Sequence, residues 1–135
     1  MTTSPAYELQ VAIVTKLKAS PAVRNLVGAR IYDNVPADAV FPYVSLGPAD
    51  ELPDDIGCRK SFEITLQIDC WSQKVGFPEV KHVSEAVRVA LDDEGISLTE
   101  NALVLFQYRG TRWLRDPDGK TSHAAMTFEA IVEQP

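Results

Sequence analysis

Cysteine is scarce in this sequence, and the usual marks of metal-binding, secreted and membrane proteins are missing. Cys58 and Cys70 are the only cysteines, and no pair of histidines accompanies them, so neither a zinc site nor a disulfide in a reducing compartment is expected. No run of 18 or more apolar residues occurs, which argues against a transmembrane helix and a membrane partner. The start, MTTSPAYELQ, lacks the basic residues and apolar core of a signal peptide, so we expect the protein in the cytoplasm.

An excess of positive charge is also missing. The 135 residues include 19 Asp and Glu against 13 Lys and Arg, for a formal net charge of -6. A protein that binds the phosphate backbone needs a basic face, so this balance argues against general or sequence-specific nucleic-acid binding. The apolar content of 45% is ordinary for a globular protein, and the length predicts a single domain over residues 1–135.

Local signatures of several large enzyme classes do not occur. The sequence has no GxSxG, no HExxH and no glycine-rich phosphate loop followed by Lys-Ser or Lys-Thr. His82 and Glu85 are three positions apart on a predicted helix, a spacing at which both side chains can bind one metal ion, but a metal site needs further ligands. A solvated surface histidine explains His82 more simply. We therefore expect no enzyme activity, no metal and no cofactor, although a dispersed active site leaves no such signature.

Two segments have the apolar spacing of amphipathic helices. One runs over about residues 5–19 after a Ser-Pro start, and the other over about residues 78–92. In the first, apolar side chains recur every four positions, at Leu9, Ile13 and Leu17. A second Ser-Pro start at residues 20–21 predicts a short helical turn that Gly28 ends.

Period-two alternation marks the strands. The clearest run is KSFEITLQIDCW, residues 60–71, with Cys70 on its apolar face as a small core residue. Residues 102–115 predict a long strand that bends near Gly110, and residues 121–133 predict a last strand with alternating faces. Shorter strands are expected at residues 31–32 and 43–46. Because strands and helices do not alternate regularly, we expect an α+β fold: a mixed, mainly antiparallel sheet with two main helices packed on one face.

The stretch GPADELPDDIG, residues 47–57, combines two prolines with several acids and predicts an exposed, mobile loop. It lacks the D-x-D-x-D-G spacing of a calcium loop, so a solvated or partner-docking loop is the better interpretation. Its acidic residues are Asp50, Glu51, Asp54 and Asp55.

One face of the expected sheet would stay partly uncovered. The outward side chains of the long strands, such as Arg109, Trp113 and Trp71, make that face a candidate subunit contact. A ligand-binding domain in which the two tryptophans stack on a base or a sugar remains an alternative.

The densest group of charges is RDPDGKTSH, which begins at Arg115. Asp116 to Gly119 follows the rule for a tight turn, with a positive φ expected at Gly119, so we predict a hairpin. Two turn aspartates supply too few ligands for calcium or magnesium. His123, on the polar face of the last strand, is expected to be exposed or at an interface. The alternative, a small enzyme with a site built from Arg115, Asp116, Asp118 and His123, stays open.

Four motifs in order carry a family resemblance: FPYVSLG at residues 41–47, IDCWS at 68–72, AVRVAL at 86–91, and the closing RDPDGKTSHAAMTFEAIVE. Together they resemble the tail-completion and tail-terminator proteins of long-tailed phages and gene transfer agents. The chain departs from that pattern at Cys70, where a valine or similar residue is expected, and in the linker before the second long helix. The matching residues of the second and last motifs are Asp69, Trp71, Ser72, Thr121, His123, Phe128, Ala130 and Glu133.

The resemblance implies a structural assembly protein without catalysis. Members form a ring, commonly a hexamer, at the head-proximal end of the tail tube, where the ring stops tube growth and offers a joining surface to the head. The expected partners are therefore further copies of the chain, the tail tube protein and the head completion or connector protein, first in the bacterial host cytoplasm and then in the particle tail. The candidate assembly residues are Asp50, Glu51, Asp54, Asp55, Trp71, Arg109, Trp113, Arg115, Asp116, Asp118 and His123.

Overall fold

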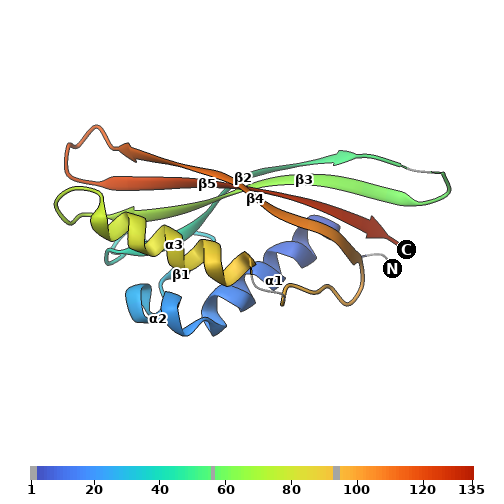
Figure 1. The fold of residues 1–135 in the computed structure, drawn as a ribbon, viewed down its shortest axis with the longest axis horizontal. Helices are drawn as coiled ribbons and strands as arrows, with labels where there is room; N and C mark the ends of the chain where they lie inside the picture. Colours follow the sequence, from blue (N-terminus) through green and yellow to red (C-terminus); the bar gives the residue numbers. More distant parts are fainter. Residues whose placement is uncertain (1–2, 56, 93–94) are drawn as a thin grey trace.

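The computed structural model describes residues 3–55, 57–92 and 95–135 and consists of two layers, a twisted sheet and a group of helices on one of its faces (Figure 1). This arrangement confirms the predicted α+β class. The elements in chain order are α1 (Pro5–Ala19), α2 (Pro21–Val27), β1 (Ile31–Tyr32), β2 (Tyr43–Pro53), β3 (Lys60–Ser72), α3 (Pro78–Asp92), β4 (Ala102–Arg115) and β5 (Ser122–Gln134).

The five strands follow the order β1-β2-β3-β5-β4. Within the described residues, β1 is parallel to β2, and the other three pairs are antiparallel. The β3–β5 pair at the centre keeps one register along its whole length, whereas β4 is shifted against β5 at two places, one of them between Tyr108 and Gly110. This irregularity lies where the sequence predicted a bend.

The core lies between the sheet and the helices. Alternate residues of β3 and β5 point to this side, and Phe128 at the centre of β5 is 1% exposed. Cys70 is fully buried there, as predicted, and burial raises the pKa of its thiol. Cys58, by contrast, lies exposed in the connection between β2 and β3. The helices contribute the buried residues Leu9, Ile13, Leu17, Val80, Val83 and Val87.

The predicted helix starts are present with their caps. Ser4 Oγ accepts a hydrogen bond from Tyr7 N at 3.2 Å, and Ser20 Oγ accepts one from Val23 N at 3.3 Å. These bonds satisfy backbone donors that have no partner inside a helix. The two Ser-Pro starts therefore place α1 and α2 where the sequence indicated.

A carboxylate ties α1 to the start of β4. Glu8 accepts hydrogen bonds from the backbone N–H groups of Thr99 (2.9 Å), Glu100 (2.8 Å) and Asn101 (2.9 Å). The Asn101 side-chain amide adds another at 2.9 Å. Burial alone would raise the pKa of Glu8, but the bonds from Glu100, Asn101 and Thr99 outweigh it and lower the pKa to about 2.

The prediction of a loop over residues 47–57 is wrong for residues 47–53, because β2 continues to Pro53. The long strand β3 offers it a partner, and Ala49 to Pro53 pair with Leu66 to Phe62. A register shift between Leu46 and Ala49 absorbs Gly47 and Pro48. A strand edge accepts prolines, since their missing N–H groups are not needed for pairing there. Ile56 of the predicted loop lies outside the described residues.

The predicted tight turn between β4 and β5 is present. Gly119 N donates to Asp116 O at 2.9 Å, and Gly119 has a φ of 76°, a conformation that side-chain-bearing residues rarely adopt. Asp118 Oδ1 accepts from the backbone N–H groups of Lys120 and Thr121 at 2.9 and 2.8 Å. Asp118 Oδ2 accepts from the Thr121 hydroxyl at 2.6 Å. The hydroxyl of Thr121 and these backbone N–H groups lower the pKa of Asp118.

Candidate functional site

A row of rings crosses the face of the sheet that the helices leave uncovered. The strand register sets Tyr43 opposite Trp71, and Trp71 opposite His123, so β2, β3 and β5 each contribute one ring. The indole of Trp71 and the imidazole of His123 lie nearly parallel, with centroids 3.9 Å apart and an interplanar angle of 7°. Tyr43 stacks on the other side of Trp71, at 6.3 Å.

Asp69, on the same face of β3 as Trp71, holds the row of rings in place. Its Oδ1 lies 2.5 Å from His123 Nε2 and accepts a hydrogen bond from Gln67 Nε2 at 2.8 Å. Trp71 Nε1 donates to Ser45 Oγ at 2.9 Å. The side chain of Asp69 is only 8% exposed, and a carboxylate that has lost its water requires such partners.

The side chain of His123 is only 15% exposed, so it is not a freely solvated histidine, and the other part of the expectation, a position at an interface, stays a prediction. Sequence alternation placed His123 on the polar face of its strand correctly. What it missed is the cross-strand register that sets His123 against Trp71 and Asp69. The motif residues Asp69, Trp71 and His123 thus form one contact group, although they are 54 positions apart at the extremes.

Gly47 explains how β2 passes over this group. A Cβ at this position would lie 2.5 Å from Asp69 Oδ2 and 3.1 Å from the backbone oxygen of Gln67. Both distances are shorter than ordinary contacts of a Cβ atom, so a side chain here would displace the Asp69 carboxylate. The glycine is therefore required by close approach.

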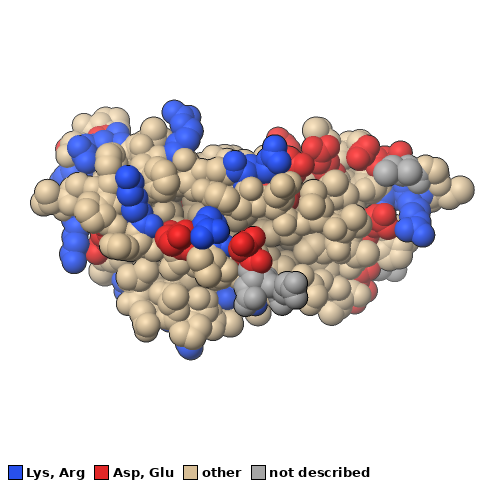
Figure 2. Space-filling view, viewed as in Figure 1, with Lys and Arg blue, Asp and Glu red and all other residues tan. Residues whose placement is uncertain are grey.

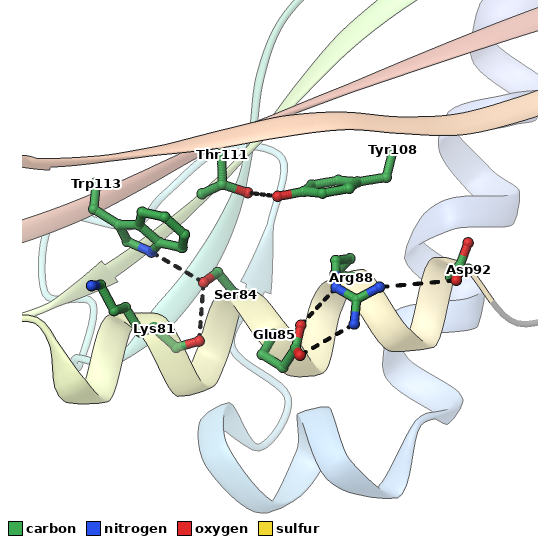
Figure 3. Close-up of polar contacts among 8 residues, drawn as sticks. All are labelled: Lys81, Ser84, Glu85, Arg88, Asp92, Tyr108, Thr111 and Trp113. Carbon is green, nitrogen blue, oxygen red and sulfur yellow. Dashed lines mark hydrogen bonds and ion pairs between the residues drawn. The ribbon is translucent and has the colours of Figure 1, made fainter.

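Trp113 does not lie on the uncovered face, and that prediction is wrong. It pairs with Ala124, whose side chain points into the core, so Trp113 lies on the helix side of the edge strand β4. Figure 3 shows its Nε1 directed at Ser84 Oγ of α3, at 3.3 Å. The Lys81 ammonium lies 5.0 Å from the centre of the Trp113 ring. The tryptophan remains 40% exposed.

A shallow groove of about 400 Å³ separates α3 from β4 beside Trp113 (Figure 3). Its charges are largely paired with one another, because Arg88 lies 2.6 Å from Glu85 and 3.9 Å from Asp92. The hydrogen bond to Arg88 lowers the pKa of Glu85. The hydroxyls of Tyr108 and Thr111 are bonded to each other across the groove floor. The groove therefore offers few unpaired groups for chemistry.

The residues of the proposed enzyme alternative are not brought together. Asp118 directs both carboxylate oxygens into its own turn. His123 faces Asp69 on the uncovered face, whereas Arg115 lies on the helix side, 4.6 Å from the centre of the Phe77 ring. Among residues 3–55, 57–92 and 95–135, no group of three or more His, Cys, Asp or Glu is arranged to hold a metal ion. No helix in that part of the chain is long and apolar enough to span a membrane.

Charge is distributed unevenly along the molecule. Figure 2 shows Asp and Glu mostly toward the end with the β2–β3 hairpin, and Lys and Arg mostly toward the end with the β4–β5 turn. Arg109 on β4 lies 4.0 Å from Glu129 on the uncovered face. The predicted acidic residues Asp50, Glu51, Asp54 and Asp55 are all exposed on the outer part of β2 and just beyond it.

The chain resembles known proteins over nearly its whole length. A family profile described as "Tail completion protein gp17" matches residues 11–133. A chain in a structure titled "Virion of native gene transfer agent (GTA) particle" is 28% identical, with a TM-score of 0.87 over 95% of this chain and 96% of that one. A structure titled "Structure of bacteriophage SPP1 gp17 protein" shares the fold, with 20% identity and a TM-score of 0.65 over 93% and 88% of the two chains. Comparison with curated proteins gives no match.

Proposed function

This chain belongs to the tail completion protein gp17 family, and we propose that it caps the head-proximal end of a tail tube as a ring. Its role is structural, as a tail-completion component of a phage or gene transfer agent particle. The observation that carries the proposal is the close similarity, over nearly the whole of both chains, to a chain of an assembled gene transfer agent virion.

A ring needs two different contact surfaces on each copy, because each subunit meets one neighbour on either side. The charge distribution supports this requirement, since acidic side chains gather toward the end with the β2–β3 hairpin and basic ones toward the end with the β4–β5 turn (Figure 2). We propose a hexamer, with the tail tube protein on one side of the ring and the head completion or connector protein on the other. Assembly would take place in the cytoplasm of the bacterial host.

The uncovered face supplies one candidate surface for these contacts. Trp71, His123 and Arg109 lie on it, and the bonds to Asp69 and Ser45 hold the first two rings rigidly. A preorganised aromatic group loses little freedom on binding, which favours such residues in interfaces. The remaining predicted assembly residues lie at the two ends of the sheet: Asp50, Glu51, Asp54, Asp55, Trp113, Arg115, Asp116 and Asp118.

Purified protein, alone and mixed with tail tubes, tests this function. Light scattering gives the number of copies in the assembly, and electron microscopy shows whether a ring sits on one end of the tube and whether tube length is limited. We expect rings at one tube end and an arrest of growth. A strict monomer that neither binds tubes nor limits their length would overturn the proposal.

A further inference from the structure

We propose that neighbouring copies meet head to tail through two oppositely charged corners of the sheet, an inference that rests on the ring function above. The corners lie at opposite ends of opposite edges, since the outer part of β2 ends beside Phe62 whereas β4 ends beside Ser122. The acidic corner consists of Asp50, Glu51, Asp54 and Asp55. The basic corner consists of Lys81, Arg112, Arg115 and Lys120.

The acidic corner is exposed but ordered. Pairing of Ala49 to Pro53 with β3 places Asp50 and Glu51 on a strand. Just beyond the strand, Asp54 N donates to Ser61 O at 2.8 Å, and Asp55 Oδ1 accepts from Ser61 N at 3.4 Å. In the described chain β1 pairs only with Val44 and Ser45, which leaves the outer part of β2 as a free edge. The sequence from Tyr43 to Asp55 contains no Lys or Arg, and Leu52, 58% exposed, lies among the acids. This is an apolar side chain surrounded by negative charge.

The basic corner has the matching composition. The sequence of β4 includes three arginines and no acidic residue. Arg115 and Lys81 lie over the rings of Phe77 and Trp113, which orients their charges at the surface. Trp113 and Leu114, 40% and 36% exposed, lie on opposite faces of this edge strand and add apolar surface on both of its sides. Exposed tryptophan and arginine together are typical of residues that dominate binding energy.

Two aspartates lie close to the basic corner and weaken its field without cancelling it. Asp116 and Asp118 stand in the turn that joins β4 to β5, and both oxygens of Asp118 are occupied by bonds inside that turn. Four cations against two carboxylates leave the corner positive. The opposite corner carries four carboxylates. Of the two cations in the adjoining hairpin, Arg59 is paired with Glu133 at 3.1 Å, and Lys60 alone leaves the corner negative. The natural complement of the acidic corner on this molecule is therefore the basic one.

Contact through unlike corners makes the arrangement of copies head to tail, because each contact joins two different surfaces. If two copies met through the same corner, like charges would face each other, whereas an acidic corner against a basic one can repeat from copy to copy. Such a head-to-tail series closes into a ring when the rotation fits. Pro53 removes an N–H donor from the edge of β2 at the acidic corner, which favours a contact made by side chains.

Charge reversal tests the pairing. One variant combines Asp50→Lys, Glu51→Lys and Asp54→Lys, which turns the acidic corner positive, and the other combines Arg112→Glu with Arg115→Glu, which turns the basic corner negative. Each alone should associate about tenfold or more weakly than the wild type, because its two corners then carry the same sign. An equimolar mixture should assemble again with the two variants alternating, since every contact regains opposite charges. Light scattering and electron microscopy, with and without tail tubes, measure assembly.

Control variants separate the proposal from general effects of charge and folding. Lys18→Glu with Arg24→Glu reverses two exposed cations on α1 and α2 and should assemble like the wild type. Circular dichroism and thermal melting verify that all variants fold. If the wild type forms rings but the corner variants assemble equally well, or the mixture fails to recover, this inference is overturned and the ring function stands. If the wild type assembles neither alone nor on tubes, both fail.

Discussion

The imidazole of His123 lies flat against the indole of Trp71 while its Nε2 contacts the Asp69 carboxylate 2.5 Å away. One side chain thereby joins an aromatic stack to a nearly buried acid. Because the three residues come from two adjacent strands, the group clamps β3 to β5 on the face that has no helix to cover it.

Removing the acid from this group should destabilise the fold. We expect Asp69→Ala to lower the free energy of unfolding by about 1–3 kcal/mol, because it leaves His123 and Gln67 without their shared acceptor. Urea denaturation followed by circular dichroism measures the change. Asp50→Ala, at an exposed position, is the matched control and should change stability little. Equal stability of the wild type and Asp69→Ala would contradict this role.

Gly47→Ala should also destabilise, through Asp69. The new methyl group would lie 2.5 Å from the carboxylate and push it from its partners, at a cost of about 1–3 kcal/mol. The double variant Gly47→Ala with Asp69→Ala should lose clearly less than the sum of the two single changes, since the contact with the carboxylate is then removed and only the approach to Gln67 at 3.1 Å remains. Strict additivity in a double-mutant cycle would argue against this contact.

The β4–β5 turn depends on Gly119. Its φ is 76°, and a Cβ added there would meet no atom within 4 Å beyond its chain neighbours, so only backbone strain opposes substitution. Gly119→Val should cost about 1 kcal/mol or more, and Gly119→Asn should cost less because asparagine tolerates this conformation. Thermal melting of both variants checks the order. A valine variant that melts like the wild type would exclude the strain.

Acid should selectively weaken the attachment of α1. The pKa of Glu8 is lowered to about 2 in the folded chain from an ordinary value of 4.5, so its contribution is fully present above pH 4.5 and is lost as pH falls toward 2. Glu8→Gln should therefore melt below the wild type at pH 7, and the difference should shrink between pH 4.5 and pH 2. Glu100→Gln, with an exposed side chain, is the control. A difference in melting temperature that stays constant with pH would exclude this linkage.

Local signals in the sequence were sufficient for the helices and for the central strand. Ser4 and Ser20 cap helices where the Ser-Pro pairs predicted, and the alternation around Cys70 gave the buried face of β3 correctly. These features depend on residues close together in the chain, so a single sequence reveals them.

Features that depend on pairing between distant strands could not be predicted from local patterns in the sequence. The prolines and acids after Leu46 predicted a loop, because nothing in that segment itself indicates that β3 pairs with it. The two register shifts of β4 decide which of its side chains face the helices, and this placed Trp113 against α3. The contact of Asp69 with His123 likewise required the β3–β5 register.

The different surroundings of the two thiols have a practical consequence. Cys70 is sealed in the core with a raised pKa, whereas Cys58 lies exposed in the β2–β3 connection, only a few positions beyond the acidic corner. A maleimide reagent should therefore modify each native subunit once, at that hairpin, without any engineered cysteine. A fluorophore attached there would report on neighbouring copies by energy transfer, and a bulky adduct would obstruct the acidic corner while leaving every charge of the chain in place.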